Sequence, residues 1–245
     1  MGNANDERIL AYNFNAPLVS FASTGSETAV SAVLTTATGS AGGHPAKKRG
    51  IYFVENSDGY LTIENVMLNP SFSVHTWVLL TANNKDQTIL SKDRNVFTNT
   101  GSDKNLLELR INALGKMEAR LARADAPGTV GTKAGSTPVT TGSWKYLVYS
   151  FAMTGGDKTT VSFYIDSTTA DGSAQDFADT IFVDKRANKM FVGIERTTSE
   201  TTFDTHFNGF IYDLHVYQSA WDTGVLTAKN GGCAVADTCE TIGFM

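Results

Sequence analysis

The stretch FNGFIYDLHVYQSAW, residues Phe207 to Trp221, decides the fold class. It begins with an Asn-Gly pair, which is a turn signal, and continues as a strand with large side chains on both faces. One acid, Asp213, lies in the middle, either as a ligand or as a polar residue on the open side of a sheet. Simple alternation puts Ile211, Asp213, His215 and Tyr217 on one face. We expect the other, more apolar face to point to the core: Phe210, Tyr212, Leu214 and Val216.

The same two-residue period recurs along most of the chain, with turn signals at short intervals. Asp58-Gly59 predicts a hairpin between two of the strands, whereas residues 123–143, rich in Gly, Pro and Thr, are expected to form a loop. Only residues 219–229 have a helical pattern. The expected strands are 8–14, part of 26–35, 51–55, 60–66, 71–81, 87–93, two within 105–122 around Gly115, 144–153, 159–166, 181–184 and 190–195. The sequence therefore predicts an all-β antiparallel β-sandwich with one short helix near the C-terminus.

Composition excludes several classes of function. The chain has 245 residues, a net charge of −5 and a pI of about 5.4, which argue against a nucleic-acid-binding surface. No run of about 20 apolar residues is present, so no membrane insertion by this chain is expected. The start, MGNANDERIL, has no apolar signal core, and we expect a mature or excised domain whose targeting signal is absent from this chain.

Both cysteines, Cys233 and Cys239, lie in the last residues, after the strand-rich part. Two thiols at this spacing without a nearby histidine make a poor zinc site. They form either a small disulfide loop or the first two cysteines of a further cysteine-rich module. Either alternative indicates an oxidising compartment, and we expect residues 229–245 to be a tail separate from a domain of residues 1–228.

Three motifs in order resemble one family. SFSVHTWVLLTANNKDQTILSKDR resembles its Phe-x-Val/Ile-x-x-Trp-Val strand followed by a strand ending in Ser-Lys, and TGSWKYLVYSFAMTGGDKTTVSFYID resembles its Gly-x-Trp-x-x-Val hairpin. FNGFIYDLHVYQSAW resembles its closing motif, Phe-x-Gly-x-Ile-Asp-Asp/Glu-Val-x-Ile-Tyr. The chain thus resembles a laminin-G-like domain of the concanavalin A-like lectin/glucanase superfamily. The resemblance implies a jelly roll, a fold that carries lectins, adhesion modules, pentraxins and glycanases.

The resemblance also implies a possible Ca²⁺ site at two strand edges, where many relatives carry carboxylates. Here Asn15 stands in the opening strand and Tyr212 replaces the first acid of the closing motif, so that Asp213 is the remaining acid. Calcium prefers six to eight oxygen ligands with carboxylate charge. We therefore expect a weakened calcium site at Asn15 and Asp213.

Other candidate ligand-binding residues are weaker. Asp93, Asn95, Asn99 and Asp103 belong to an oxygen-rich loop over 92–105, which can bind a cation or a sugar or can be an ordinary hydrated loop. Trp77, Trp144 and Trp221 fall at positions where packing is expected. The candidates for exposed rings that stack on a sugar are Tyr60, Tyr164 and Tyr212.

No catalytic arrangement is present in the sequence. The resemblance implies that a glycanase would carry Glu-x-Asp-x-x-Glu on one strand, and the chain lacks it. Glu108 and Glu118 have basic neighbours two residues away, which predicts solvent-facing ladders of opposite charge. We expect a non-catalytic extracellular or cell-surface module that binds a glycan. The alternative is an adhesive module that contacts another protein, and a glycoside hydrolase ranks below both.

Overall fold

A computed structural model of the chain describes residues 8–12, 33–36, 49–53, 60–66, 68–93, 105–122, 130–154, 158–177, 188–196 and 203–229. Most of these residues lie in strands, and the described part contains one helix, α1 (Thr223–Lys229). The strands are β1 (Arg8–Tyr12), β2 (Val33–Thr36), β3 (Arg49–Phe53), β4 (Leu61–Val66), β5 (Phe72–Leu80), β6 (Gln87–Asp93), β7 (Asn105–Ile111), β8 (Lys116–Ala122), β9 (Val130–Pro138), β10 (Trp144–Thr154), β11 (Lys158–Ile165), β12 (Gln175–Phe177), β13 (Asn188–Val192), β14 (Glu195–Arg196), β15 (Phe203–Asp204) and β16 (Gly209–Tyr217).

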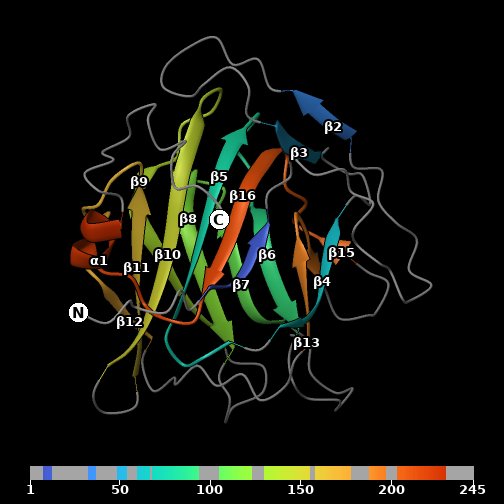
Figure 1. Ribbon diagram of the computed structural model, residues 1–245. Coiled ribbons are helices and arrows are strands. Elements are labelled where there is room, and N and C mark those ends of the chain that lie inside the picture. Colours follow the sequence, from blue (N-terminus) through green and yellow to red (C-terminus); the bar gives the residue numbers. More distant parts are fainter. Residues whose placement is uncertain are drawn as a thin grey trace.

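The strands form two antiparallel sheets that face each other. Sheet A has the order β12-β11-β10-β5-β16-β3-β2, with β1 also paired to β16, and sheet B has the order β4-β13-β6-β7-β8-β9. Figure 1 looks onto sheet A, with β10, β5 and β16 in front of β8, β7 and β6. A short pair, β14 and β15, accompanies sheet B. The predicted antiparallel β-sandwich is therefore confirmed.

Alternation along each strand supplies the core between the sheets. On β5, the alternate residues Phe72, Val74 and Val78 are fully buried, and Phe72 stacks on Phe151 of β10 with ring centroids 4.4 Å apart. On β7, Leu107 and Leu109 face them from sheet B. The period of two in the sequence thus reflects one face per sheet that is removed from water.

The closing strand β16 does not alternate simply. Its pairing with β5 shifts between Tyr212 and His215, so that Asp213 and Leu214 together oppose a single residue of β5. Because of this β-bulge, the fully buried residues are Ile211, Leu214 and Val216. The expectation that Phe210 and Tyr212 share the core face with Leu214 is wrong, since the extra residue reverses the alternation half-way along the strand.

Two further expectations about strands are wrong. Residues 51–53 lie in β3 of sheet A, whereas β4 pairs with β13 in sheet B, so these strands do not form a hairpin. A turn signal favours a reversal of the chain but does not specify which sheet the next strand joins. Residues 130–138, expected in a loop, form β9, because the edge of β8 gives this Gly- and Thr-rich segment its backbone partners. Residues 181–184 lie outside the described part.

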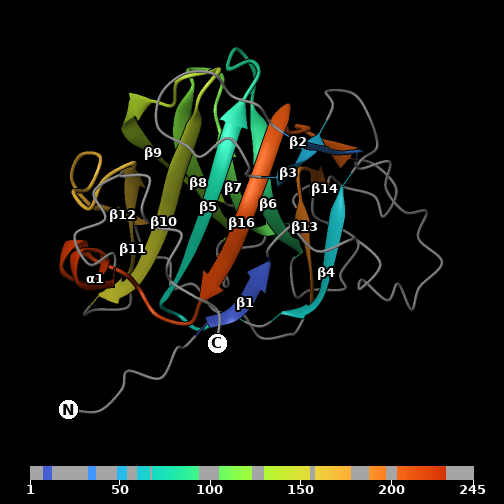
Figure 2. The ribbon, with the colours of Figure 1, turned by 45° about the horizontal axis from the view of Figure 1, so that its top comes forward.

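The short helix is confirmed and begins at Thr223, later than expected. The carboxylate of Asp222 accepts a hydrogen bond from the backbone N–H of Val225 at 2.8 Å, which caps the helix. Trp221 and Leu226 are buried against Val148 and Tyr164 of sheet A, so α1 covers part of the outer face of that sheet (Figure 2). Within the described residues, no helix has the length and apolar character needed to cross a membrane.

Candidate functional site

The structure places few of the candidate residues that the sequence suggested. Asn15, Asn95, Asn99, Asp103, Cys233 and Cys239 lie outside the described residues. Asp93 ends β6 and Asp213 lies at the bulge of β16, but their side chains are also outside the description. No group of three or more His, Cys, Asp or Glu side chains that could hold a metal ion occurs in the part of the chain that is described. Calcium at Asn15 and Asp213 stays a prediction.

The expected exposed tyrosine rings are mostly buried. Tyr164 is 3% exposed, and burial raises the pKa of its hydroxyl, while Tyr212 is 9% exposed. The expectation of exposed rings is therefore wrong for both, because each lies on the outer face of sheet A under other side chains. Tyr60 is half-buried, with its ring centroid 5.8 Å from that of Phe191, and its role in binding stays a prediction.

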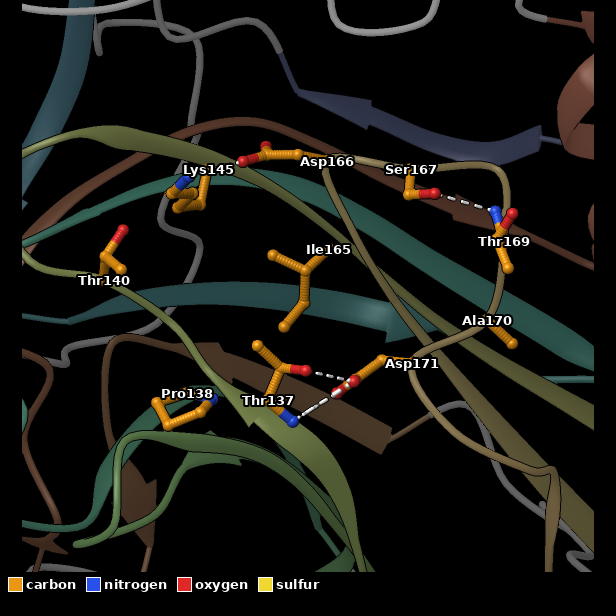
Figure 3. A pocket seen from close by; sticks show the side chains of 10 residues that line it. All are labelled: Thr137, Pro138, Thr140, Lys145, Ile165, Asp166, Ser167, Thr169, Ala170 and Asp171. Atoms are coloured by element: carbon orange, nitrogen blue, oxygen red, sulfur yellow. Dashed lines mark hydrogen bonds and ion pairs between the residues drawn. The ribbon is translucent and has the colours of Figure 1, made fainter.

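A pocket opens at one end of the sandwich, between β9 of sheet B and the ends of β10 and β11 of sheet A. Its volume is about 410 Å³. One wall carries Thr137, Pro138 and Thr140, and the other is formed by the segment 166–171 that follows β11. Figure 3 shows the side chain of Ile165 between these two walls. We call this the rim pocket.

Asp171 fixes one wall of the rim pocket. Its carboxylate accepts hydrogen bonds from the backbone N–H of Ser136 at 2.9 Å, the backbone N–H of Thr137 at 3.0 Å and the Thr137 hydroxyl at 2.7 Å. A Cβ on Gly135 would lie 2.5 Å from Oδ2 of this carboxylate, so a side chain there would have to displace it. Asp171 therefore ties the segment after β11 to β9, across the two sheets.

Asp166 fixes the other wall. Its carboxylate accepts from the Nζ of Lys145 at 2.7 Å and from the backbone N–H of Tyr146 at 2.8 Å, and its own backbone N–H donates to the carbonyl of Tyr146 at 2.9 Å. Its φ of 49° is in the left-handed region, which the tight turn after β11 requires. The Asp166 side chain thus caps this turn.

The rim pocket offers hydroxyl groups, one ion pair and one apolar surface. Thr140, Ser167 and Thr169 are exposed at its mouth, and the Ser167 hydroxyl accepts from the backbone N–H of Thr169 at 2.9 Å. Such a set can exchange hydrogen bonds with a polyol and pack against its C–H groups. The sequence reasoning missed these residues. The available signals were the hydroxyl-rich runs 136–137 and 167–169 and the turn pair Asp171-Gly172.

The charged ladder of sheet B is present but is not solvent-facing. Arg120 donates to Glu108 at 2.9 Å, and Arg110 forms an ion pair with Glu118, as their register predicts. However, Glu108 is 2% and Glu118 is 7% exposed. The expectation of a solvated face is wrong because the ladder is covered by neighbouring side chains, among them Glu195 of β14, whose carboxylate lies 3.7 Å from Arg120.

Comparison with known families agrees with this fold. A laminin-G-type family model, described as the concanavalin A-like lectin/glucanases superfamily, matches residues 55–223. The chain belongs to this family. The resemblance seen in the sequence motifs is therefore confirmed for the concanavalin A-like superfamily, whose match spans β4 to the start of α1. Among curated proteins, none matches the chain.

Several solved structures resemble the chain at low sequence identity. A heptameric SAP-like pentraxin from Limulus polyphemus has a TM-score of 0.53 at 13% identity over 75% of this chain and 82% of that chain. Domain 4 of an extracellular GH43 arabinanase from Geobacillus stearothermophilus, in complex with arabinotriose, has a TM-score of 0.53 at 16% identity over 80% of each chain. The Ruminococcus gnavus IT-sialidase CBM40 bound to α2,3 sialyllactose has a TM-score of 0.50 at 16% identity over 69% of this chain and 97% of that chain. At such identities the likeness establishes the fold.

Proposed function

We propose that this chain is a non-catalytic glycan-binding module and that the rim pocket holds the sugar. The observation that carries the proposal is a pocket of about 410 Å³ with hydroxyl side chains on both walls and Ile165 between them. Small-molecule sites in proteins have volumes of about 300–1,000 Å³ and combine an apolar surface with a few fixed polar groups. The rim pocket meets both conditions.

The chemistry of the lining suits a neutral part of a glycan. Sugar hydroxyls donate and accept, and so do the hydroxyls of Thr140, Ser167 and Thr169. The Lys145–Asp166 pair offers further polar atoms whose positions are fixed, since both carboxylate oxygens of Asp166 are already bonded. A fixed site loses less entropy on binding than one that must be ordered by its ligand.

The comparisons support the same class of ligand. Two solved structures with this fold, the arabinanase domain and the sialidase CBM40, are described with arabinotriose and with sialyllactose. The arabinanase is described as extracellular, and we propose an extracellular or cell-surface location for this chain as well. Which sugar binds is left to experiment, because these relatives share no more than 16% identity with the chain.

A glycan array followed by calorimetric titration tests the proposal. We expect binding of a specific oligosaccharide by the wild-type chain, and a loss of at least about ten-fold in affinity in Thr140→Trp and Thr169→Trp, because a bulky ring at either position fills the rim pocket. Thr141→Trp is the matched control, since Thr141 is exposed next to the pocket but does not line it. Equal affinity of the wild type and the three variants would show that the sugar binds outside the rim pocket.

The remaining alternatives are separated by the same material. Absence of binding across a broad array would leave the adhesive, protein-contacting module as the better function. Release of reducing sugar from common β-glucans would contradict the non-catalytic assignment. Titration with calcium, and repetition of the glycan titration in a chelator, test the predicted site at Asn15 and Asp213.

A further inference from the structure

Five side chains on the outer side of sheet B form a closed ring of polar contacts around β14. The Thr88 hydroxyl lies 2.8 Å from Glu108 Oε1 and 2.7 Å from the hydroxyl of Thr205. The Thr205 hydroxyl lies 3.0 Å from Glu195 Oε2. Arg120 Nη1 closes the ring, at 2.9 Å from Glu108 Oε2 and 3.7 Å from Glu195 Oε1.

The ring is one proton short when both glutamates are ionised. The three contacts that join Glu108, Thr88, Thr205 and Glu195 each need one hydrogen between two oxygens. An ionised carboxylate only accepts, and each threonine hydroxyl supplies a single hydrogen. Two hydrogens cannot serve three contacts, so one pair of oxygens would face each other without a proton. A third proton on one carboxyl satisfies all three contacts in one direction around the chain.

The positions of the arginines decide which carboxyl holds that proton. Glu108 lies 2.9 Å from Arg120 and 3.7 Å from Arg110, and both cations favour its ionised form. Within the ring, Glu195 lies 3.7 Å from Arg120, farther from that guanidinium than Glu108 does. A neutral Glu195 then donates to Thr205, Thr205 donates to Thr88, and Thr88 donates to the ionised Glu108.

We propose that β14 and β15 form a proton-dependent latch, which a neutral Glu195 holds closed against sheet B and which loosens when Glu195 ionises. The latch residues are Glu195, Thr205, Thr88 and Glu108. Loosening follows from the count of protons, since ionisation leaves one contact of the ring without a hydrogen and adds a second negative carboxylate beside Arg120.

The electrostatic surroundings set the pH range of the latch. The pKa of the Glu195 carboxyl is raised from 4.5 to about 7 by the sum of these surroundings. Burial is the largest cause and the charge of Glu108 also raises the pKa, whereas the Thr205 hydroxyl, Arg120 and Arg110 lower it. Glu118 is held by Arg110, and His206 follows Thr205 in the chain. Lys92 of β6 pairs with core-facing Leu107 and is buried on the other side of the sheet. The side chains of Asp93, Arg196 and Asp204 are outside the described part.

Backbone contacts show which part of the chain the latch holds. Thr205 has a φ of 46°, a strained conformation for a β-branched residue, and its carbonyl accepts from the N–H of Thr88 at 2.9 Å. The N–H of Phe207 donates to the carbonyl of Gly193 at 2.9 Å. These contacts join the entry to β16 to β6 and to the residues before β14. Loss of the ring removes side-chain bonds that keep Thr205 in this conformation.

Hydrogen exchange of the wild-type chain between pH 5 and 8 tests the latch. After correction for the intrinsic chemical rate, protection of the peptide that covers Glu195–Phe207 should fall by up to about ten-fold per pH unit towards pH 7, and should level off above it, because only the closed state keeps the proton. Glu195→Gln is neutral at every pH and keeps an N–H donor for Thr205, so its protection should not change with pH.

Two further measurements keep the test sharp. Asp176→Asn is the matched control, since Asp176 also accepts from a threonine, Thr160, at 2.6 Å, but on sheet A; it should behave as the wild type. Carbon-13 NMR of labelled glutamate carboxyls in the wild type should show one resonance that titrates near pH 7. The latch is overturned by flat wild-type protection, by an unchanged pH dependence in Glu195→Gln, or by the absence of any glutamate titrating between pH 6 and 8.

Discussion

The imidazole Nδ1 of His75 lies 2.8 Å from the hydroxyl oxygen of Tyr146, on the face of sheet A that points away from sheet B. His75 is 1% exposed, and its Nε2 lies 3.0 Å from the hydroxyl of Ser73. Its ring also contacts Trp221, with centroids 4.3 Å apart. The histidine is thus packed and hydrogen-bonded on both ring nitrogens.

We expect His75 to make the fold sensitive to acid. Burial lowers the pKa of its imidazole well below 6.5, and the charge of His215 lowers it further. Below pH 6.5, the unfolded chain therefore binds a proton at His75 that the folded chain excludes. The stability that the neutral, buried His75 provides is thus complete above pH 6.5, and it is lost as the pH falls below that value.

Denaturant unfolding of the wild type and His75→Phe at several pH values from 5 to 8 measures this contribution as the difference between the two proteins. The difference should shrink as the pH falls below 6.5. His215→Gln keeps the buried imidazole and should keep most of the wild-type sensitivity to acid. Parallel pH profiles of wild type and His75→Phe would contradict the assignment.

Gly209, the second residue of the Asn-Gly pair and the first residue of β16, should not tolerate a side chain. Its φ is 147°, and a Cβ would collide with the backbone carbonyl oxygen of Leu79 in β5. We expect Gly209→Ala to destabilise the fold by more than about 3 kcal/mol, which combines backbone strain with a displaced strand. Thermal and denaturant unfolding measure this change.

Gly142→Ala is the matched control for the glycine prediction. Gly142 has a φ of 73°, but a Cβ there would meet nothing within 4 Å. We therefore expect a cost of only about 1 kcal/mol, from strain alone. Equal effects of the two substitutions would show that the contact with Leu79 does not matter.

Asp171→Ala should open the rim pocket. The substitution removes the acceptor of three donor groups: the backbone N–H of Ser136, the backbone N–H of Thr137, which contacts both carboxylate oxygens, and the Thr137 hydroxyl. We expect a loss of stability of about 1–3 kcal/mol and a larger relative loss of glycan affinity. Asp176→Asn serves as a control for the removal of an exposed acid that does not line the pocket. Unchanged affinity in Asp171→Ala would argue against the pocket as the binding site.

Phe72→Ala should be among the most damaging substitutions in the core. Phe72 is fully buried and stacks on Phe151 between the sheets. Its truncation is expected to cost about 3–5 kcal/mol in the free energy of unfolding. Met153→Ala, at a site that is 53% exposed, should change stability by less than about 0.5 kcal/mol. A small effect of Phe72→Ala would mean that the sheets repack around the lost ring.

Sequence patterns predicted those elements whose partners are close in the chain. The hairpin of β10 and β11 and that of β7 and β8 agree with expectation, because short turns with Gly bring consecutive alternating segments together. The helix α1 was predicted for a similar reason, since its cap and its apolar residues lie within a few positions of each other. The family motifs identified the fold correctly, because they cover strands of both sheets.

Prediction failed where a distant partner decides the outcome. The residues of β9 favour a loop, but they form a strand because their backbone pairs with the edge of β8. The strands β3 and β4 separate into two sheets because their partners, β16 and β13, lie in different sheets. Tyr164 is buried against Trp221 and Leu226, and Tyr212 packs against Trp144 of β10. A pattern within one strand cannot reveal these contacts.

The sequence by itself determined the class of fold, since the period of apolar residues and the turn signals act between neighbours in the chain. Tertiary structure alone decided the bulge at Asp213 and Leu214, which sets the faces of β16 through its pairing with β5. It also decided the rim pocket and the ring around Glu195. In each, side chains far apart in sequence meet within a few ångströms, and the geometry of those meetings depends on how the sheets pair and pack.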